Sequence, residues 1–318
     1  MIDENSQTVM FPDLEIFGYR TENKVTFFSA KSLAKELVIT FPFNVLFFSA
    51  PFDVNHIIAV DTQKPNVILL FDYQNNTVIN SIETGNPILQ MHFSGKFSVA
   101  IYNLGAVIIS CNPFVILHTL RTPTIPNGIC ISSIPTDSNH CLFTYEDEIN
   151  SGSLIIQRIP SSSPPTVFKT SKSPIRCVAI SPNCQYIVTT SEKGTIARLW
   201  SIDGTLIQES RRGLFSAVIE HVSFSPDSSL FCVSSNHQTS HIFKSNKSTE
   251  NQYILPKAEV VIPLESSKYI RSYILSGNHS LCLINDSGSC FIYSIDHESG
   301  NIGLKSQIML PTIVKFIN

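Results

Sequence analysis

The sequence predicts an all-β protein, a β-propeller of about seven blades. Runs of β-branched and aromatic residues, each of strand length, follow one another along the 318 residues, separated by Asn, Asp, Gly, Ser and Pro. Almost no segment keeps helical periodicity over about eleven residues. The stretch Cys177–Trp200 is repeated at His221–Phe243, and a repeat period of forty-odd residues is typical of propeller and solenoid folds.

In chain order, the runs begin with LEIFGY, KVTFFSA, NVLFFSA, HIIAV, NVILLFDY and TVINSIET. They continue with ILQMHFSG, FSVAIYN, AVIISC, ILHTLRT, GICISSI, HCLFTY and SLIIQRIP. Only AKSLAKELVI suits a helix, and it is too short to change the class. Taken four at a time, the strands predict blades near 13–40, 44–84, 86–121, 127–168, 174–213, 217–263 and 269–312.

These blades are expected to form one domain over residues 13–318, preceded by a disordered tail over residues 1–12. Two polar stretches interrupt the pattern: Pro160–Phe168 is expected to be a loop or the entry to an outer strand, since proline excludes it from a central strand, and Ser245–Gln252 is expected to be an exposed loop. The acidic start MIDENSQ does not resemble a secretory signal, and no apolar run approaches the roughly 20 residues that a membrane helix needs. A cytoplasmic protein, and a monomer, is expected.

The internal repeat places residues of the fifth and sixth units at equivalent positions. Each copy contains a strand, a turn on Ser-Pro-Asn or Ser-Pro-Asp, a second strand, another turn and a third strand, which is a blade without its outermost strand. The matched pairs are Ser191 with Ser235, Thr195 with Thr239, Arg198 with His241 and Trp200 with Phe243. After the matched threonines the first copy has one extra residue, which predicts a strand bulge there. Trp200 is expected in the core.

Charge is unevenly distributed. The whole chain carries −3, which predicts no general attraction to nucleic acid. From Phe168 to Gly213, however, the segment contains seven Lys and Arg residues and only three Asp and Glu residues. This segment therefore carries a net charge of +4, and the rest of the chain carries −7. A basic island on an acidic body suggests a local anionic ligand.

Within the island, Arg211 and Arg212 stand where a strand is expected to end. Side chains on a strand alternate between its two faces, so neighbouring arginines should point to opposite sides of the sheet. One strand could therefore supply two separate anion pockets. The alternative is a solvated strand end, or an ion pair with Glu192 or Glu209.

No catalytic or metal-binding pattern stands out. The eight cysteines show no CxxC spacing and lie mostly in apolar runs, where free cysteine acts as a small apolar residue. The acidic run Glu146–Glu148 has no histidine nearby in the sequence and suits a solvated loop. We therefore expect no enzyme, no metal and no cofactor.

Three segments, TSEKGTIARLW, QESRRG and FSPDSSLFCVSSNHQTSHIF, together resemble the PROPPIN family of WIPI-type, WD40-like seven-bladed propellers. The similarity continues through NVILLFDYQNNTVI and KSPIRCVAIS, and more weakly through DSGSCFIY. The resemblance implies binding of phosphatidylinositol 3-phosphate and the 3,5-bisphosphate at two rim sites that flank the arginine strand. It also implies a role in autophagosome formation or endolysosomal membrane traffic, with a phosphoinositide-containing membrane and autophagy or trafficking proteins as partners.

Carried over to this chain, the resemblance assigns four residues to each site. The first site would use Lys193, Thr195, Arg198 and Arg211; the second would use Arg212, Ser235, Thr239 and His241. Arginine suits bidentate phosphate contacts, and hydroxyl groups can complete such a site. The threonines could instead be simple strand formers, Ser235 a turn residue, and His241 a half-buried strand histidine.

The family also implies an apolar loop that dips into the membrane, and the candidates here are Tyr253, Ile254 and Leu255, which could instead form a strand. The expected function is thus a phosphoinositide effector that recruits autophagy or trafficking proteins to phagophore, endosomal or vacuolar and lysosomal membranes. The alternative is a WD-repeat scaffold for protein partners that binds no lipid.

Overall fold

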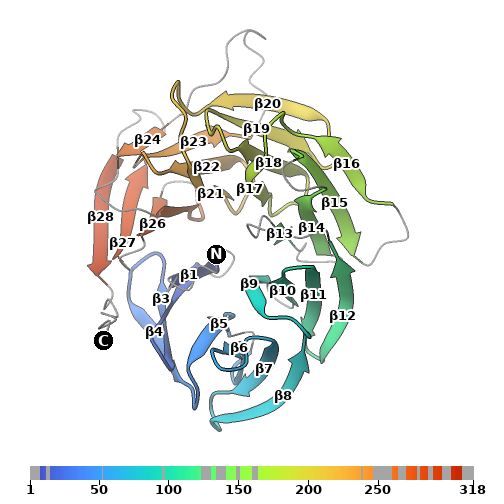
Figure 1. The fold of residues 1–318 in the computed structure, drawn as a ribbon. Coiled ribbons are helices and arrows are strands. Elements are labelled where there is room, and N and C mark those ends of the chain that lie inside the picture. Colours follow the sequence, from blue (N-terminus) through green and yellow to red (C-terminus); the bar gives the residue numbers. More distant parts are fainter. Residues whose placement is uncertain are drawn as a thin grey trace, which may run out of the picture.

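Seven four-stranded antiparallel sheets form a closed ring around a central axis (Figure 1). This computed structural model describes residues 8–11, 15–51, 53–94, 97–122, 130–133, 141–147, 151–159, 164–237, 239–245, 260–263, 270–277, 280–285, 289–295 and 302–309. The described residues contain only strands, turns and loops, and no helix among them could cross a membrane. The predicted all-β, seven-bladed propeller is confirmed.

Each blade uses four strands in chain order. The first two blades contain β1 (Thr8–Phe11), β2 (Ile16–Arg20), β3 (Lys24–Ser29), β4 (Lys35–Thr40), β5 (Val45–Phe48), β6 (His56–Asp61), β7 (Val67–Asp72) and β8 (Thr77–Glu83). The third and fourth contain β9 (Ile88–Ser94), β10 (Phe97–Tyr102), β11 (Gly105–Cys111), β12 (Phe114–Arg121), β13 (Cys130–Ser133), β14 (Cys141–Glu146), β15 (Ser153–Ile159) and β16 (Thr166–Lys169).

The fifth and sixth blades contain β17 (Ile175–Ile180), β18 (Tyr186–Ser191), β19 (Ile196–Ser201), β20 (Leu206–Arg211), β21 (Ile219–Phe224), β22 (Leu230–Ser235), β23 (Thr239–Lys244) and β24 (Val260–Pro263). The seventh contains β25 (Ile270–Ile274), β26 (Ser280–Asn285), β27 (Ser289–Ile295) and β28 (Ile302–Met309). In every blade the first strand lies nearest the axis and the fourth at the rim (Figure 1).

The core lies between neighbouring blades, because each sheet buries both faces against the next. Between the fifth and sixth blades, for example, Leu199 packs in one cluster with Phe231 and Phe243. Trp200 lies in the core, as predicted, and its indole Nε1 donates a hydrogen bond to Thr189 Oγ1 at 2.9 Å. The apolar contacts fix the third strand of the fifth blade against the second and third strands of the sixth.

The ring closes between the first and seventh blades by packing rather than by a shared sheet, since every described sheet is one continuous stretch of chain. Met10 shares a buried cluster with Leu275 of the last blade. The expectation of a tail over residues 1–12 is corrected for Thr8–Phe11, which forms β1 and pairs with β2. The reason is apolar burial: Phe11 is only 5% exposed.

The two copies of the repeat form the same turn at their Ser-Pro sequences, as predicted. In the fifth blade Ser181 Oγ donates to Asn183 Oδ1 at 2.7 Å, and in the sixth Ser225 Oγ donates to Asp227 Oδ1 at 2.6 Å. Both serines therefore anchor the same turn between the first and second strands of a blade.

The extra residue of the first copy is not a bulge. Pairing of β18 with β19 runs without a register shift, as does pairing of β22 with β23. The extra residue lies instead in the β18–β19 turn, so Thr195 is in that turn while Thr239 begins β23. The predicted match of Arg198 with His241 holds, because their partners Thr189 and Val233 occupy equivalent positions.

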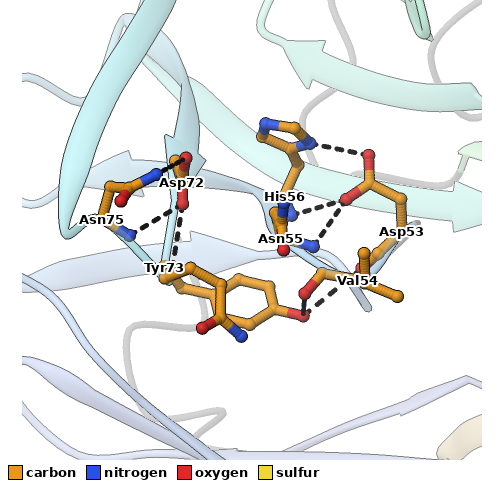
Figure 2. A network of polar contacts seen from close by, with 8 residues as sticks. Asp53, Val54, Asn55, His56, Asp72, Tyr73 and Asn75 are labelled. Atoms are coloured by element: carbon orange, nitrogen blue, oxygen red, sulfur yellow. Dashed lines mark hydrogen bonds and ion pairs between the residues drawn. The ribbon is translucent and has the colours of Figure 1, made fainter.

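The turns of the second blade are fixed by a polar network (Figure 2). Asp53 Oδ1 accepts hydrogen bonds from the backbone N–H groups of Asn55 and His56, both at 2.8 Å, and His56 Nδ1 lies 2.7 Å from Asp53 Oδ2. The Tyr73 hydroxyl donates to the Val54 carbonyl at 2.7 Å. These polar groups are hydrogen-bonded to one another, so the network stabilises the β5–β6 loop and the turn that follows β7.

Candidate functional site

A cavity of about 520 Å³ opens between the fourth and fifth blades. One wall is the segment Lys169–Ser173, which begins at the last residue of β16, and the other is formed by the end of β18, the β18–β19 turn and the start of β19. Its lining residues are Lys169, Thr170, Ser171, Lys172, Ser173, Ser191, Lys193, Thr195, Ile196 and Arg198. Four are cationic, five carry a hydroxyl group and none is acidic, so the cavity suits an anion that accepts several hydrogen bonds.

The shape of the β18–β19 turn depends on Gly194. Its φ is +64°, a left-handed conformation that favours glycine, and a Cβ atom there would lie 2.0 Å from the Ala217 carbonyl oxygen. The turn therefore packs directly on the loop that follows β20. This close approach holds Lys193 and Thr195 at the mouth of the cavity.

Arg198 is held in the cavity by an ion pair. Its Nε lies 2.6 Å from Glu209 Oε1, across the β19–β20 pairing, and the two side chains are 22% and 32% exposed. The ion pair considered for the two neighbouring arginines thus forms with Arg198 instead. Glu209 uses one edge of the guanidinium and leaves the other edge for a ligand.

The two adjacent arginines have different environments. Because Arg212 lies just after the end of β20, the expectation that they point to opposite faces of one strand stays a prediction. Arg211 ends β20 and is exposed, paired in register with Ile196. Arg212 is only 7% exposed; its Nε donates to the Gly194 carbonyl at 2.8 Å and its Nη2 donates to the Phe215 carbonyl at 2.7 Å. Burial lowers the pKa of Arg212 from its ordinary value. Two of its five N–H groups are therefore occupied by the backbone.

The first predicted site is thus only partly assembled around one cavity. Lys193, Thr195 and Arg198 line it together, whereas Arg211 is not among the lining residues. Lys169 and Lys172 line it as well, although neither was predicted as a ligand. In the sequence, both lysines belong to the basic island. Only the structure shows that they lie across the cavity from the β18–β19 turn.

The second predicted site is a polar cluster on the sixth blade. Thr239 Oγ1 lies 3.1 Å from His241 Nε2 and 3.4 Å from Ser235 Oγ. Burial, together with the positive charge of Arg212, lowers the pKa of His241 to about 4. The structure therefore brings all four predicted residues into one neighbourhood. His241 is neutral at pH 7 in the ligand-free protein.

Two further expectations from the sequence concern a membrane-inserting apolar loop and metal binding. Tyr253, Ile254 and Leu255 lie outside the described residues. Among the residues that are described, no group of three His, Cys, Asp or Glu side chains could hold a metal ion.

Comparison with known proteins places these observations in a family. The chain is 28% identical over 193 residues to autophagy-related protein 18 of Dictyostelium discoideum, covering 60% of this chain and 51% of that protein. It is also 28% identical over 196 residues to WD repeat domain phosphoinositide-interacting protein 2 of Mus musculus, covering 61% and 44%. The chain thus spans about half the length of these relatives.

The fold matches a solved structure along nearly its whole length. Kluyveromyces lactis Hsv2 superimposes with a TM-score of 0.80 at 18% identity, covering 96% of this chain and 98% of that one. The family model described as PROPPIN matches residues 41–260, which is more than half of the chain. The chain therefore belongs to the PROPPIN family.

Proposed function

We propose that this protein is a phosphoinositide effector. It binds phosphatidylinositol 3-phosphate, the 3,5-bisphosphate or both at two rim sites on either side of Arg211 and Arg212, and as a monomer recruits autophagy or endolysosomal trafficking proteins to the membrane. The observation that carries the proposal is the cavity between the fourth and fifth blades, lined by four cations and no carboxylate. The printed names of the relatives, which mention autophagy and phosphoinositide interaction, support the same function.

The first site can hold a phosphate with its present geometry. Arg198 presents a guanidinium edge that Glu209 does not use, and Lys193 and Thr195 lie at the same cavity. Charge-assisted hydrogen bonds to phosphate contribute about 1.5–3 kcal/mol each, so two or three of them give a useful affinity for a soluble headgroup.

The second site is the weaker one in the ligand-free state. His241 is neutral, and Arg212 is bound to two backbone carbonyls. A phosphate between them would favour the protonated form of His241 and so would raise its pKa. Two weak sites on one body act together on a surface, where the second binding event becomes intramolecular.

Vesicle flotation tests the proposal. Phosphatidylcholine vesicles that contain phosphatidylinositol 3-phosphate are expected to carry the protein upward, and plain phosphatidylcholine vesicles are not. The variant Arg198→Ala with Lys193→Ala should lose most of this binding, whereas a charge-matched pair on distant blades, Lys64→Ala with Lys305→Ala, should not. Equal flotation with both kinds of vesicle would contradict recognition of the phosphoinositide headgroup, and no flotation with either would favour the scaffold alternative.

A further inference from the structure

The loop that follows the two arginines exposes two large apolar side chains. In the segment Gly213–Val218, Leu214 is 77% exposed and Phe215 is 78% exposed. Removing such side chains from water is favourable, in proportion to the apolar area covered. A pair of adjacent, almost fully exposed apolar residues therefore gains most if a partner covers it.

This loop is fixed in place between the two proposed headgroup sites. On one side the Ala217 N–H donates to the Lys193 carbonyl at 3.2 Å, in the turn that borders the cavity. On the other side Val218 and Asn236 exchange two hydrogen bonds, each 3.0 Å long, in the turn of the sixth blade between Ser235 and Thr239.

Arg212 connects the loop to the first of these turns. Its guanidinium bonds to the Gly194 carbonyl and to the Phe215 carbonyl at the same time. The backbone at the apolar pair is therefore held by a cation that the proposed function places in a headgroup site. A surface that offers phosphate to this edge of the propeller also meets Leu214 and Phe215.

The charge around the loop indicates what covers it. Lys193 and Arg211 are both exposed next to it, and the nearby cavity adds Lys172 and Arg198. One acidic side chain, Glu192, is exposed in the same turn, so the four cations outnumber it. Apolar side chains in such a basic setting match a bilayer with anionic headgroups, where the apolar groups enter the acyl boundary and the cations remain among phosphates.

We propose that Leu214 and Phe215 form a membrane anchor that enters the bilayer between the two headgroup sites. This inference rests on the proposed function, because it requires that the same edge binds phosphoinositide. It assigns the apolar contact to a described loop beside Arg212, separate from the segment Tyr253–Leu255 suggested by the sequence.

The test uses a double variant, Leu214→Ser with Phe215→Ser, in the full chain. Neither side chain is buried, and Arg212 bonds to the backbone of Phe215, so folding is expected to be unchanged. The matched control is Val54→Ser with Ile79→Ser, two residues of the second blade that are 79% and 52% exposed. Binding is measured with soluble inositol 1,3-bisphosphate and with phosphatidylcholine vesicles that contain phosphatidylinositol 3-phosphate.

The loop variant should bind the soluble headgroup as the wild type does, and its vesicle affinity should fall about tenfold or more, while the control loses nothing. A second variant, Phe215→Trp, reports insertion directly. Trp200 is the only native tryptophan and is buried, so the wild-type emission serves as the background, and the added emission should shift to shorter wavelength with these vesicles.

Two outcomes would overturn the anchor but leave the proposed function standing. One is an unchanged vesicle affinity of the loop variant. The other is an unshifted emission spectrum of Phe215→Trp on vesicles that bind the protein. If the wild type binds neither headgroup nor vesicles, the proposed function itself fails.

Discussion

If the first site binds phosphate as proposed, Glu209 should lower its affinity, and neutralising this carboxylate should strengthen binding. The carboxylate lies 2.6 Å from Arg198 Nε and competes with a ligand for the same cation. A phosphate on the opposite edge of the guanidinium would lie about 6 Å from Glu209, where two unit charges repel by roughly 1.4 kcal/mol at an effective dielectric constant of about 40. Allowing for salt screening, about 1 kcal/mol remains, which corresponds to about fivefold in affinity.

The variant Glu209→Gln keeps the size of the side chain and one hydrogen-bond acceptor for Arg198. We expect it to bind soluble inositol 1,3-bisphosphate about fivefold more tightly than the wild type in isothermal titration calorimetry. The control is Glu83→Gln, which makes the same change in net charge on β8 of the second blade. If Glu209→Gln binds no more tightly than the control, the carboxylate does not compete with the ligand and the reasoning is refuted.

Three further predictions concern stability and the second site. Gly194→Ala should lower the free energy of unfolding by about 1–3 kcal/mol in urea titration, because of its positive φ and the short contact with Ala217; an unchanged midpoint would contradict that packing. Burial lowers the pKa of His221 to about 3. Between pH 6.5, its ordinary pKa, and pH 3, the imidazole is therefore protonated in the unfolded chain but neutral in the native protein. Stability should therefore be complete above pH 6.5 and fall toward pH 3, and His221→Gln should flatten this slope. Headgroup binding should strengthen as the pH falls from 7 to 5, and His241→Gln should remove that part of the pH dependence.

Much of the fold could be predicted because turn chemistry and strand patterning mark each blade independently. The fifth blade was expected over 174–213 and its strands run from Ile175 to Arg211. The Ser-Pro turn determines where its first strand ends and its second begins, and the same signal recurs in the sixth blade. The strand Thr8–Phe11 was missed because four residues next to a polar start carry too little pattern, and only packing against later blades reveals their burial.

The site could be predicted less completely than the fold. The family resemblance assigned Lys193, Thr195 and Arg198 to one site, and these three residues line one cavity. The contribution of Lys169 and Lys172 depends on how the fourth blade meets the fifth, which no local pattern contains. The same is true of the backbone contacts of Arg212, since they require the loop after β20 to fold back onto the β18–β19 turn.

The measurement that tests the central claim most directly is a crystal structure with soluble inositol 1,3-bisphosphate. The account predicts that one phosphate lies in the cavity between the fourth and fifth blades, within hydrogen-bond distance of Arg198 and Lys193. It predicts a second headgroup beside Arg212 and His241. A headgroup bound elsewhere on the propeller, with the cavity empty, would contradict the account.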